Sequence, residues 1–400
     1  MMFEKHILCS DCGKSYPVKA RIFRCFKCRG SLEVVFDYPR LKRTLSRRKL
    51  LARPLNHARY RELYPVRSLV SIQEGGTPLV RSRNLESEFK LPFELWFKYE
   101  AQNPTGSFKD RGSSVEIARA LDLGAQRAIR ASTGNMGASV AAYSALAGLE
   151  CSIFTPRDAA PVKMEQILAY GARVYHIRGD YTRAARMVER ANDEFGIYML
   201  GDYLWRREGT KSVGFEIADQ MLLSRGEPDY VVCPVGNGTL LSATWKAFKE
   251  FKTLGWVKKK PRMMGVQAST CSPVYTAFRR RRKITPKCGR TVAVAIECGN
   301  PLDGTRALQA MRESRGACET VTDKQILKVR ELLAAREGLF AEPAGAVALA
   351  GLLKAKNRIK RHSRVVCLVT GHGLKTPRTA IPGRPIEVPG RLDIVDKIFK

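Results

Sequence analysis

The sequence contains no apolar run that approaches the roughly 18 to 20 residues needed for a membrane-spanning helix. Its first residues, MMFEKHILCSDC, include charged side chains where a secretory signal would need an uninterrupted apolar stretch. It also contains no internal repeat and no long low-complexity segment. We therefore expect a globular protein of the cytoplasm without a membrane partner.

Acidic residues are few relative to basic ones, with 38 Asp and Glu against 70 Lys and Arg and a formal net charge of +32. Such an excess suggests the hypothesis of nucleic-acid binding. The basic residues, however, occur in short runs along the whole chain, as at 47–49, 279–283 and 358–361. We interpret the charge as a solvated surface that attracts phosphate-bearing ligands, and we do not expect a nucleic-acid partner.

The chain has 400 residues, 44% of them hydrophobic, which is enough to bury the cores of two or three domains. From about residue 73, apolar strand-like runs alternate with amphipathic helical stretches. This rhythm predicts an α/β fold with mostly parallel sheets, in which functional loops lie where strands end and helices begin. We expect strands at 94–99, 127–131, 151–155, 173–177, 230–234, 263–267 and 365–370, and helices at 112–121, 138–147, 162–170, 181–194 and 211–223.

Eleven cysteines, an odd number, argue against a disulfide framework. Cys9, Cys12, Cys25 and Cys28 form the pattern C-x-x-C-x12-C-x-x-C, whose spacing suits a closed tetrahedral zinc site of four thiolates. A closed site has no open coordination position, so we assign it a structural role, with vestigial free thiols as the alternative. We interpret the seven scattered cysteines as small core residues: Cys151, Cys233, Cys271, Cys288, Cys298, Cys318 and Cys367.

Two segments precede the α/β rhythm. Residues 1–38 are too short to fold on an apolar core alone, and we interpret them as a zinc-ribbon-like module with short strands. Residues 39–72 are rich in Arg and Lys and contain Pro54 and Pro65, so we expect a basic linker with about one helix.

The segment N-P-T-G-S-F-K-D-R-G at residues 103–112 places Lys109 at the start of a predicted helix, behind a turn of Pro, Gly and small hydroxyl residues. The cationic potential and partial burial expected there favour a neutral, nucleophilic amine that can form a Schiff base. The residues alone also allow an exposed lysine in the first turn of a helix.

Three further glycine-containing loops each follow a predicted strand. S-T-G-N-M-G-A-S at 132–139 can direct backbone N–H groups and one amide at an anion or a ring, although an ordinary βα turn is the alternative. P-V-G-N-G-T-L-L at 234–241 suits a phosphate but lacks the G-x-G-x-x-G spacing of dinucleotide sites. L-V-T-G-H-G-L-K at 368–375 contains His372, which we interpret as a structural residue.

Together, these segments resemble those of the threonine synthase-like family of fold-type II (tryptophan synthase β-like) enzymes, which depend on pyridoxal 5'-phosphate (PLP). The resemblance implies two three-layer αβα domains in a catalytic body at 73–385, the smaller domain at roughly 110–205, followed by a tail at 386–400. Fold-type II enzymes are often dimers, so it also implies a homodimer. Weaker matches in the family's order lie at 74–79, 206–212, 299–301 and 342–346.

The resemblance also implies a role for each site residue. Lys109 would carry the cofactor and act in catalysis, Asn135 would bond the phenolic oxygen, and Thr370 would face the pyridine nitrogen. Ser132 and Thr133 would receive the substrate carboxylate. The cofactor phosphate would lie on Gly236, Asn237, Gly238, Thr239 and Leu240, where the family usually has glycine in place of Thr239.

The chain departs from the family where the substrate phosphate would bind. Met136 stands where the family commonly has threonine, Leu200 and Gly201 replace an Asn–Ser pair, and Thr210 replaces glutamine. Arg206 matches the family's arginine and could clamp a phosphate with two parallel hydrogen bonds. Each lost charge-assisted hydrogen bond costs about 1.5–3 kcal/mol, which is enough to change the preferred substrate.

Three functional hypotheses follow. The first is a PLP-dependent lyase, a threonine synthase that converts O-phosphohomoserine and water to threonine and phosphate. The second is a threonine/serine dehydratase-like or cysteate synthase-like enzyme that performs only β-elimination or β-replacement. The third is a basic zinc-ribbon protein that binds nucleic acid with an inactive enzyme fold, and the retained Lys109 and phosphate loop argue against it.

Overall fold

The computed structural model describes residues 2–156, 161–179, 181–201, 203–224 and 226–376. The tail predicted at 386–400 lies outside these residues. Within the described ranges, no helix is both long and apolar enough to cross a membrane.

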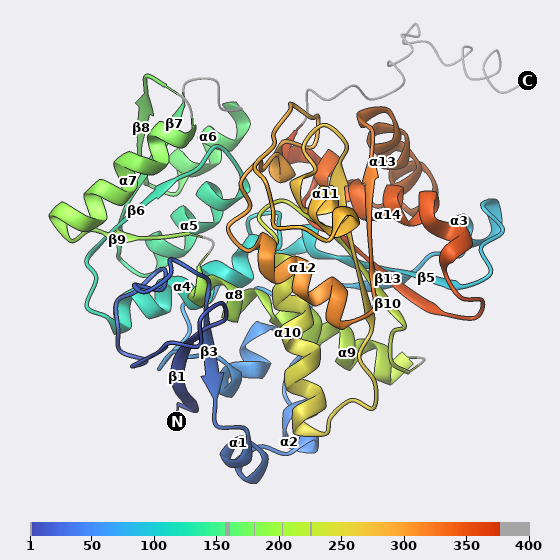
Figure 1. The fold of residues 1–400 in the computed structure, drawn as a ribbon, viewed down its shortest axis with the longest axis horizontal. Helices are drawn as coiled ribbons and strands as arrows, with labels where there is room; N and C mark the ends of the chain where they lie inside the picture. The colour runs from blue at the N-terminus through green and yellow to red at the C-terminus, as the bar shows by residue number, and fades with distance from the viewer. Residues whose placement is uncertain (1, 157–160, 180, 202, 225, 377–400) are drawn as a thin grey trace, which may run out of the picture.

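Two sheets form the main body, one in each half of the molecule (Figure 1). Both are parallel except for one antiparallel edge strand, β4. Strands such as Y-V-V-C-P at 230–234 are buried along their whole length, as expected for parallel strands covered on both faces by helices. The six-stranded sheet has the order β12 (Ala317–Val321), β11 (Arg262–Ala268), β10 (Tyr230–Pro234), β13 (Arg364–Val369), β5 (Glu94–Tyr99) and β4 (Leu79–Arg81), and the four-stranded sheet has the order β8 (Arg173–Ile177), β7 (Glu150–Pro156), β6 (Arg127–Ala131) and β9 (Tyr198–Met199).

Helices cover the sheets, so the predicted α/β fold class is confirmed. α14, which is rich in Ala, Gly and Leu, packs against β10, β11 and β13, where its small side chains permit close approach. The helices are α3 (Asn84–Glu88), α4 (Lys109–Asp122), α5 (Asn135–Leu146), α6 (Pro161–Ala169), α7 (Tyr181–Phe195), α8 (Leu204–Thr210), α9 (Ser212–Ser224), α10 (Thr239–Leu254), α11 (Pro273–Arg280), α12 (Gly304–Glu313), α13 (Asp323–Glu337) and α14 (Pro343–Ala355), with short 3-10 turns η2 (Glu100–Gln102), η3 (Val294–Ile296), η4 (Lys356–Arg358) and η5 (Gly373–Lys375).

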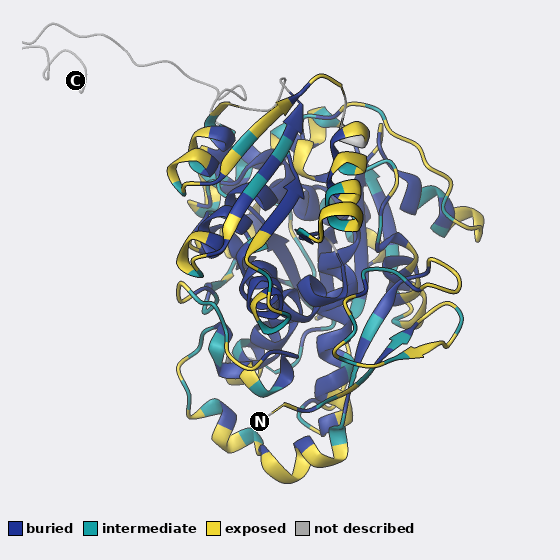
Figure 2. Ribbon diagram, turned by 90° about the vertical axis from the view of Figure 1, so that its left-hand side faces the viewer, coloured by how far each residue is buried: buried dark blue, intermediate teal, exposed yellow. Residues whose placement is uncertain are grey.

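The segment expected as a basic linker is more ordered than the sequence suggested. It forms α1 (Tyr38–Thr44), α2 (Arg47–Leu51) and the 3-10 helix η1 (His57–Leu63), where we expected about one helix. Leucines spaced along these helices point inward and join the core beneath α9 and α10. Figure 2 shows the exposed outer faces of α1 and α2 at the foot of the molecule.

The N-terminal module is a three-stranded antiparallel sheet of β2 (Ser15–Tyr16), β1 (Glu4–Cys9) and β3 (Leu32–Phe36). β3 lies against α8 and α10 of the main body. Arg207 Nη1 of α8 donates to the Leu32 carbonyl (2.8 Å), and Lys246 Nζ of α10 donates to the Val34 carbonyl (2.7 Å). The inward side chains of β3 are buried in the same core as α10. The module therefore packs as a part of the main body.

Candidate active site

Three neighbouring strands of the six-stranded sheet deliver three of the sequence motifs to one edge. β13 lies between β5 and β10, and all three run parallel. The Lys109 loop follows β5, the loop at 370–373 follows β13, and the glycine loop at 235–238 follows β10. The carboxyl ends of parallel strands are where open α/β sheets bind ligands, so these loops converge on one candidate site.

Lys109 is the first residue of α4, and backbone contacts fix its loop. The Phe108 N–H donates to the Thr370 carbonyl (3.1 Å), and Ser107 pairs with Gly371 in an isolated bridge. The Lys109 Nζ lies 4.7 Å from the centroid of the Phe108 ring. The N-terminus of α4 therefore presents Lys109 directly beside the loop that contains Thr370.

The first turn of α4 is held by buried polar contacts. Asp110 accepts hydrogen bonds from the Thr105 N–H (2.7 Å) and hydroxyl (2.5 Å), and burial raises the pKa of Asp110 to about 6 in spite of them. Arg111 donates to Glu100 and Glu216, each at 2.6 Å, with all three side chains fully buried. Burial alone would raise the pKa of Glu216, but the charge of Arg111 holds it below its ordinary value. A buried charge is tolerated only with such partners, so this network fixes the start of α4.

Asn135, the first residue of α5, connects the four-stranded sheet to the other half of the site. Its Nδ2 donates to Glu342 Oε1 (2.6 Å), and the Glu342 N–H donates to the Gly371 carbonyl (3.0 Å). Ser132 Oγ accepts from the Gly137 N–H (2.9 Å) and so shapes the loop, in which Thr133 is half-buried. The structure thus brings the second motif to the same place as Lys109 and Thr370.

The glycine loop ends at the N-terminus of α10, which begins at Thr239 without a side-chain cap. Gly238 has φ +88°, and a Cβ there would lie 2.8 Å from the Asp303 carbonyl, so only glycine fits. The Asp303 N–H donates to the Asn237 carbonyl (2.9 Å), and the Thr239 hydroxyl donates to Asp303 Oδ2 (2.9 Å). The Thr239 hydroxyl therefore supports the loop from behind, which the sequence did not indicate.

Arg206 lies close to Lys109 but is bound within the protein. It forms an ion pair with Glu116 (2.6 Å) and donates to the Lys109 carbonyl (3.0 Å), with 1% of its side chain exposed. Glu116 also accepts from the Gly201 N–H (2.6 Å). In this structure Arg206 positions Lys109, and its role as a substrate ligand stays a prediction.

Sequence reasoning missed two buried lysines and a carboxylate beside this site. Lys163 Nζ lies 3.6 Å from Glu342 Oε2, and a Cβ on Gly134 would lie 3.8 Å from the same Nζ. Lys375 Nζ donates to the Thr105 carbonyl (2.7 Å), and burial lowers the pKa of Lys375 to about 8. Lys375 and Glu342 both lie within segments that the sequence analysis singled out, whereas no pattern marked Lys163.

These residues fit PLP, which carries a phosphate, a ring and an aldehyde. An uncapped helix N-terminus behind glycine suits the phosphate. Asn135 Oδ1 is buried and has no hydrogen-bond partner among the described residues, so it is available to a ligand. A lysine at the head of a helix suits the aldehyde.

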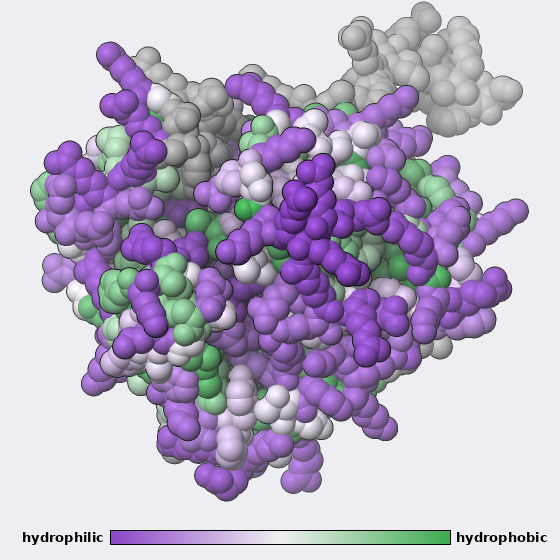
Figure 3. All heavy atoms as spheres, in the orientation of Figure 1, coloured by the Kyte–Doolittle hydropathy of each residue, from purple (hydrophilic) through white to green (hydrophobic). Residues whose placement is uncertain are grey.

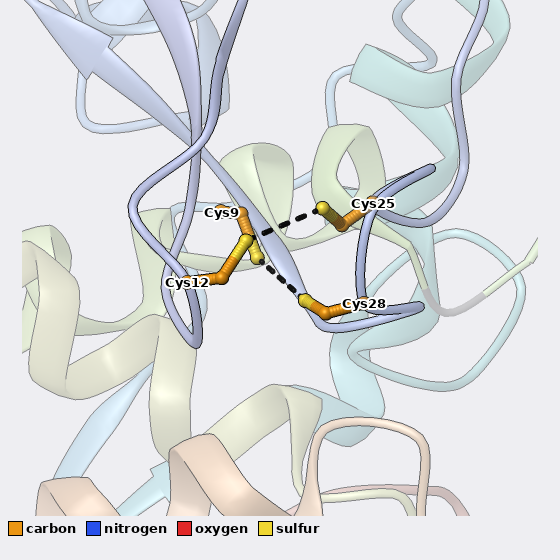
Figure 4. Close-up of side chains that lie close together, drawn as sticks. All are labelled: Cys9, Cys12, Cys25 and Cys28. Carbon is orange, nitrogen blue, oxygen red and sulfur yellow. Dashed lines mark hydrogen bonds between the residues drawn. The ribbon is translucent and has the colours of Figure 1, made fainter.

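The four N-terminal cysteines converge, as Figure 4 shows, with all four sulfurs within 4.8 Å of one another. Cys9 Sγ lies 3.5 Å from Cys28 Sγ, and Cys12 Sγ lies 3.6 Å from Cys25 Sγ. Burial opposes ionisation of Cys25, but the Tyr16 hydroxyl at 3.0 Å helps to lower its pKa to about 6. Four convergent thiols, one of them with a lowered pKa, fit a tetrahedral zinc ion.

The cysteine module contacts both halves of the body. Phe23 packs against Tyr203 with ring centroids 5.2 Å apart, and Arg24 donates to the Leu302 carbonyl (3.3 Å). Ser31, which follows the last cysteine, donates to Asp303 Oδ1 (3.1 Å). Asp303 also holds the glycine loop, so one side chain links the module to the candidate phosphate site.

Comparison with known proteins agrees with this geometry. The model of the family described as "pyridoxal-phosphate dependent enzyme" matches residues 70–371. A threonine synthase of Methanocaldococcus jannaschii is 43% identical over 98% of both chains, and one of Methanosarcina acetivorans is 42% identical over 94% of this chain and 93% of its own. Among solved structures, a T.th. threonine deaminase matches with TM-score 0.65 and 25% identity over 76% of this chain and 94% of its own. The chain belongs to the pyridoxal-phosphate dependent enzymes and, within them, to the threonine synthase family.

Proposed function

We propose that this enzyme is a threonine synthase that converts O-phosphohomoserine and water to threonine and phosphate. The observation that carries the proposal is the convergence of four motifs from distant parts of the chain around Lys109. The relatives that match this chain over almost its full length have the same named activity.

When bound, PLP draws electrons from the substrate carbon next to the amino group, which permits loss of a proton there. Lys109 Nζ is the proposed base that removes and returns protons at the α and β carbons, because it stands at the head of α4. The backbone N–H groups at the start of α10 would hold the cofactor phosphate, Asn135 would hold the phenolic oxygen, and Thr370 would face the ring nitrogen.

Substrate recognition needs one site for a carboxylate and one for a phosphate. Ser132 and Thr133 are the proposed carboxylate ligands, since their loop leads into the N-terminus of α5. Lys163 supplies buried positive charge beside that loop, Lys375 supplies it at the Thr105 carbonyl, and the Arg206 guanidinium lies behind Lys109. These cations support a substrate that bears a phosphate.

One observation favours the second hypothesis, a lyase that acts on a substrate without a γ-phosphate. Met136 and Leu200 are buried where hydroxyl and amide donors would be needed, and Arg206 is paired with Glu116. An enzyme with these features would retain the cofactor site but discriminate poorly in favour of a phosphate ester.

Parallel assays with O-phosphohomoserine, threonine and O-phosphoserine distinguish the two hypotheses. We expect phosphate release with equimolar threonine from O-phosphohomoserine, and slow or no conversion of the other two. Formation of 2-oxobutanoate from threonine, without turnover of O-phosphohomoserine, would replace the synthase with a dehydratase.

We also propose that Cys9, Cys12, Cys25 and Cys28 bind one structural zinc ion, supported by their four convergent sulfurs. Metal analysis of the purified protein should give one zinc per chain, and substitution of any of the four cysteines by serine should abolish it. Metal-free protein with four titratable thiols at this module would contradict the proposal. The homodimer, the cytoplasmic location and the domain boundaries stay predictions from the sequence.

A further inference from the structure

A second group of cysteines lies in the large domain, at the carboxyl end of β11. Cys271 follows this strand and pairs with Ala268 in an isolated bridge. Its Sγ lies 3.2 Å from the Sγ of Cys288, a residue 17 positions later in the chain. The sequence predicts both as core residues, but only Cys271 is buried, whereas Cys288 is exposed.

The backbone around Cys288 is packed tightly against its surroundings. A Cβ on Gly289 would lie 2.9 Å from the Thr270 carbonyl, and a Cβ on Gly299 would lie 2.5 Å from Cys288 Cβ. The Lys287 N–H also donates to the Gly299 carbonyl (3.0 Å). These contacts hold Cys288 against the turn that contains Cys271, so the proximity of the two thiols is built into the fold.

The two thiols differ in access. Burial, together with the neighbouring Cys288, raises the pKa of Cys271 to about 12, so Cys271 is a poor first nucleophile. Cys288 is exposed, and it stands five positions after the basic run at 279–283 in the sequence. Figure 3 shows strongly hydrophilic side chains gathered near α11. The positive charge of the run at 279–283, which overlaps the end of this helix, attracts anionic reagents.

Cys271 and Cys288 could alternatively bind a metal ion. Within the described ranges, however, only the N-terminal module gathers three or more metal-ligating side chains closely enough for an ion. Two thiols alone do not complete the four-ligand shell of a structural zinc site.

We propose that Cys271 and Cys288 form a dithiol that reacts with anionic low-molecular-weight disulfides and closes to an intramolecular disulfide. The Cys288 thiolate attacks one sulfur of the reagent, the reagent's S–S bond breaks, and one half leaves as a thiolate that takes up the Cys288 proton. The Cys271 thiolate then attacks the Cys288 sulfur, and the second half leaves with the Cys271 proton. Two protein thiols are oxidised to one disulfide, and one reagent disulfide is reduced to two thiols.

The disulfide would restrict the motion of Cys288 and of Gly299, which packs against it, next to the candidate cofactor loop. Cys298, next to Gly299, donates through its Sγ to Asn237 Oδ1 (3.0 Å). The cross-link therefore stabilises a segment that supports the glycine loop. A closed loop of this length should raise the thermal unfolding midpoint by about 5 °C.

The test treats the full-length protein with oxidised glutathione and maps disulfides by peptide mass spectrometry without reduction. We expect a peptide pair joined through Cys271 and Cys288, an intact mass lower by two hydrogens, and reversal by dithiothreitol. Cross-linking should proceed faster as the pH rises, because Cys271 must lose its proton.

Two variants distinguish a cross-link that forms because the two thiols are close from one that reflects general thiol reactivity. Cys271→Ser should accumulate a stable glutathione adduct at Cys288, whereas Cys318→Ser, which changes a buried single cysteine, should cross-link like the unmodified protein. A lasting adduct at Cys288 in the unmodified protein would overturn the proposal, as would a cross-link found only among the N-terminal cysteines. Each readout is independent of turnover, so failure here would not affect the proposed activity.

Discussion

The loops of the N-terminal module and those of the candidate active site are held in place by different kinds of interaction. In the module, four thiols converge within 4.8 Å on a small three-stranded sheet, and a bound ion would hold the loops. In the active site, the loops grow from buried parallel strands, and networks such as that of Arg111, Glu100 and Glu216 fix them from within. The proposed zinc ion would therefore hold the loops of the module, whereas contacts within the protein hold the loops of the active site.

The two regions nevertheless share contacts to one residue, Asp303. Asp303 accepts from Ser31 of the module and from Thr239 of the glycine loop, and its N–H donates to the Asn237 carbonyl. Loss of the ion should therefore weaken cofactor binding, whereas loss of cofactor attachment should leave the ion in place. This asymmetry can be tested.

The largest effect is expected from Lys109→Ala. This variant should lose the visible absorbance of lysine-bound PLP and at least ~1000-fold in turnover, because it lacks the proposed attachment point and base. Its zinc content should not change. Lys328→Ala, which removes an exposed lysine of α13, is the control and should keep both properties. A Lys109→Ala variant that retains the absorbance band would remove Lys109 from its assigned role.

Loss of the metal should affect both regions. Cys25→Ser should abolish zinc binding, lower the thermal unfolding midpoint and raise the dissociation constant for PLP by about 10-fold, because the module's contacts to Asp303 loosen. The control is Cys233→Ala, which changes a buried cysteine of β10 and should retain zinc. Unchanged PLP affinity in a zinc-free protein would show that the two regions are independent.

A smaller effect concerns acid stability at η1, which lies between the two regions in the sequence. Burial, opposed by the charge of Glu74, lowers the pKa of His57 to about 4. Below about pH 6.5 the unfolded chain binds a proton that the folded chain resists, so the free energy of unfolding falls with decreasing pH by up to about 3 kcal/mol. Urea unfolding at pH 7 and pH 4.5 should show a smaller difference for His57→Gln than for the parent. Equal differences would mean that His57 does not titrate as described.

The smallest effect is expected from Ser31→Ala, which removes the module's hydrogen bond to Asp303. One buried hydrogen bond contributes about 0.5–1.5 kcal/mol, so the dissociation constant for PLP should rise by about 2- to 10-fold while zinc remains bound. Ser87→Ala, at an exposed position of α3, serves as the matched control. A rise seen equally in both variants would argue against the Asp303 connection.

Local patterns predicted much of this structure. The run at 230–234 and the glycines behind it correctly indicated a buried strand that leads into a helix, since both signals lie within about ten residues. The confirmed family resemblance rested on such strand-to-helix loops. By contrast, β12 was missed because its A-C-E-T-V sequence has neither alternation nor a continuous apolar run.

Contacts between distant segments could not be predicted in this way. Glu342 reaches Asn135 across 207 positions, and Ser31 reaches Asp303 across 272. The prediction that all seven single cysteines are core residues was wrong for the exposed Cys288 and holds only in part for the half-buried Cys298, because exposure depends on how a turn packs and not on the residue type. Lys163 has no local signal, since a lysine in the first turn of a helix is ordinarily solvated.

The most direct test of the proposed activity follows the oxygen of water. The PLP-loaded enzyme would convert O-phosphohomoserine in oxygen-labelled water, and both products would be analysed by mass spectrometry. We predict threonine with the label in its β-hydroxyl group and phosphate without label, because the bond from the γ carbon to oxygen breaks and water adds at the β carbon. Labelled phosphate accompanied by homoserine, or no turnover by enzyme that shows the lysine-bound absorbance, would contradict a threonine synthase.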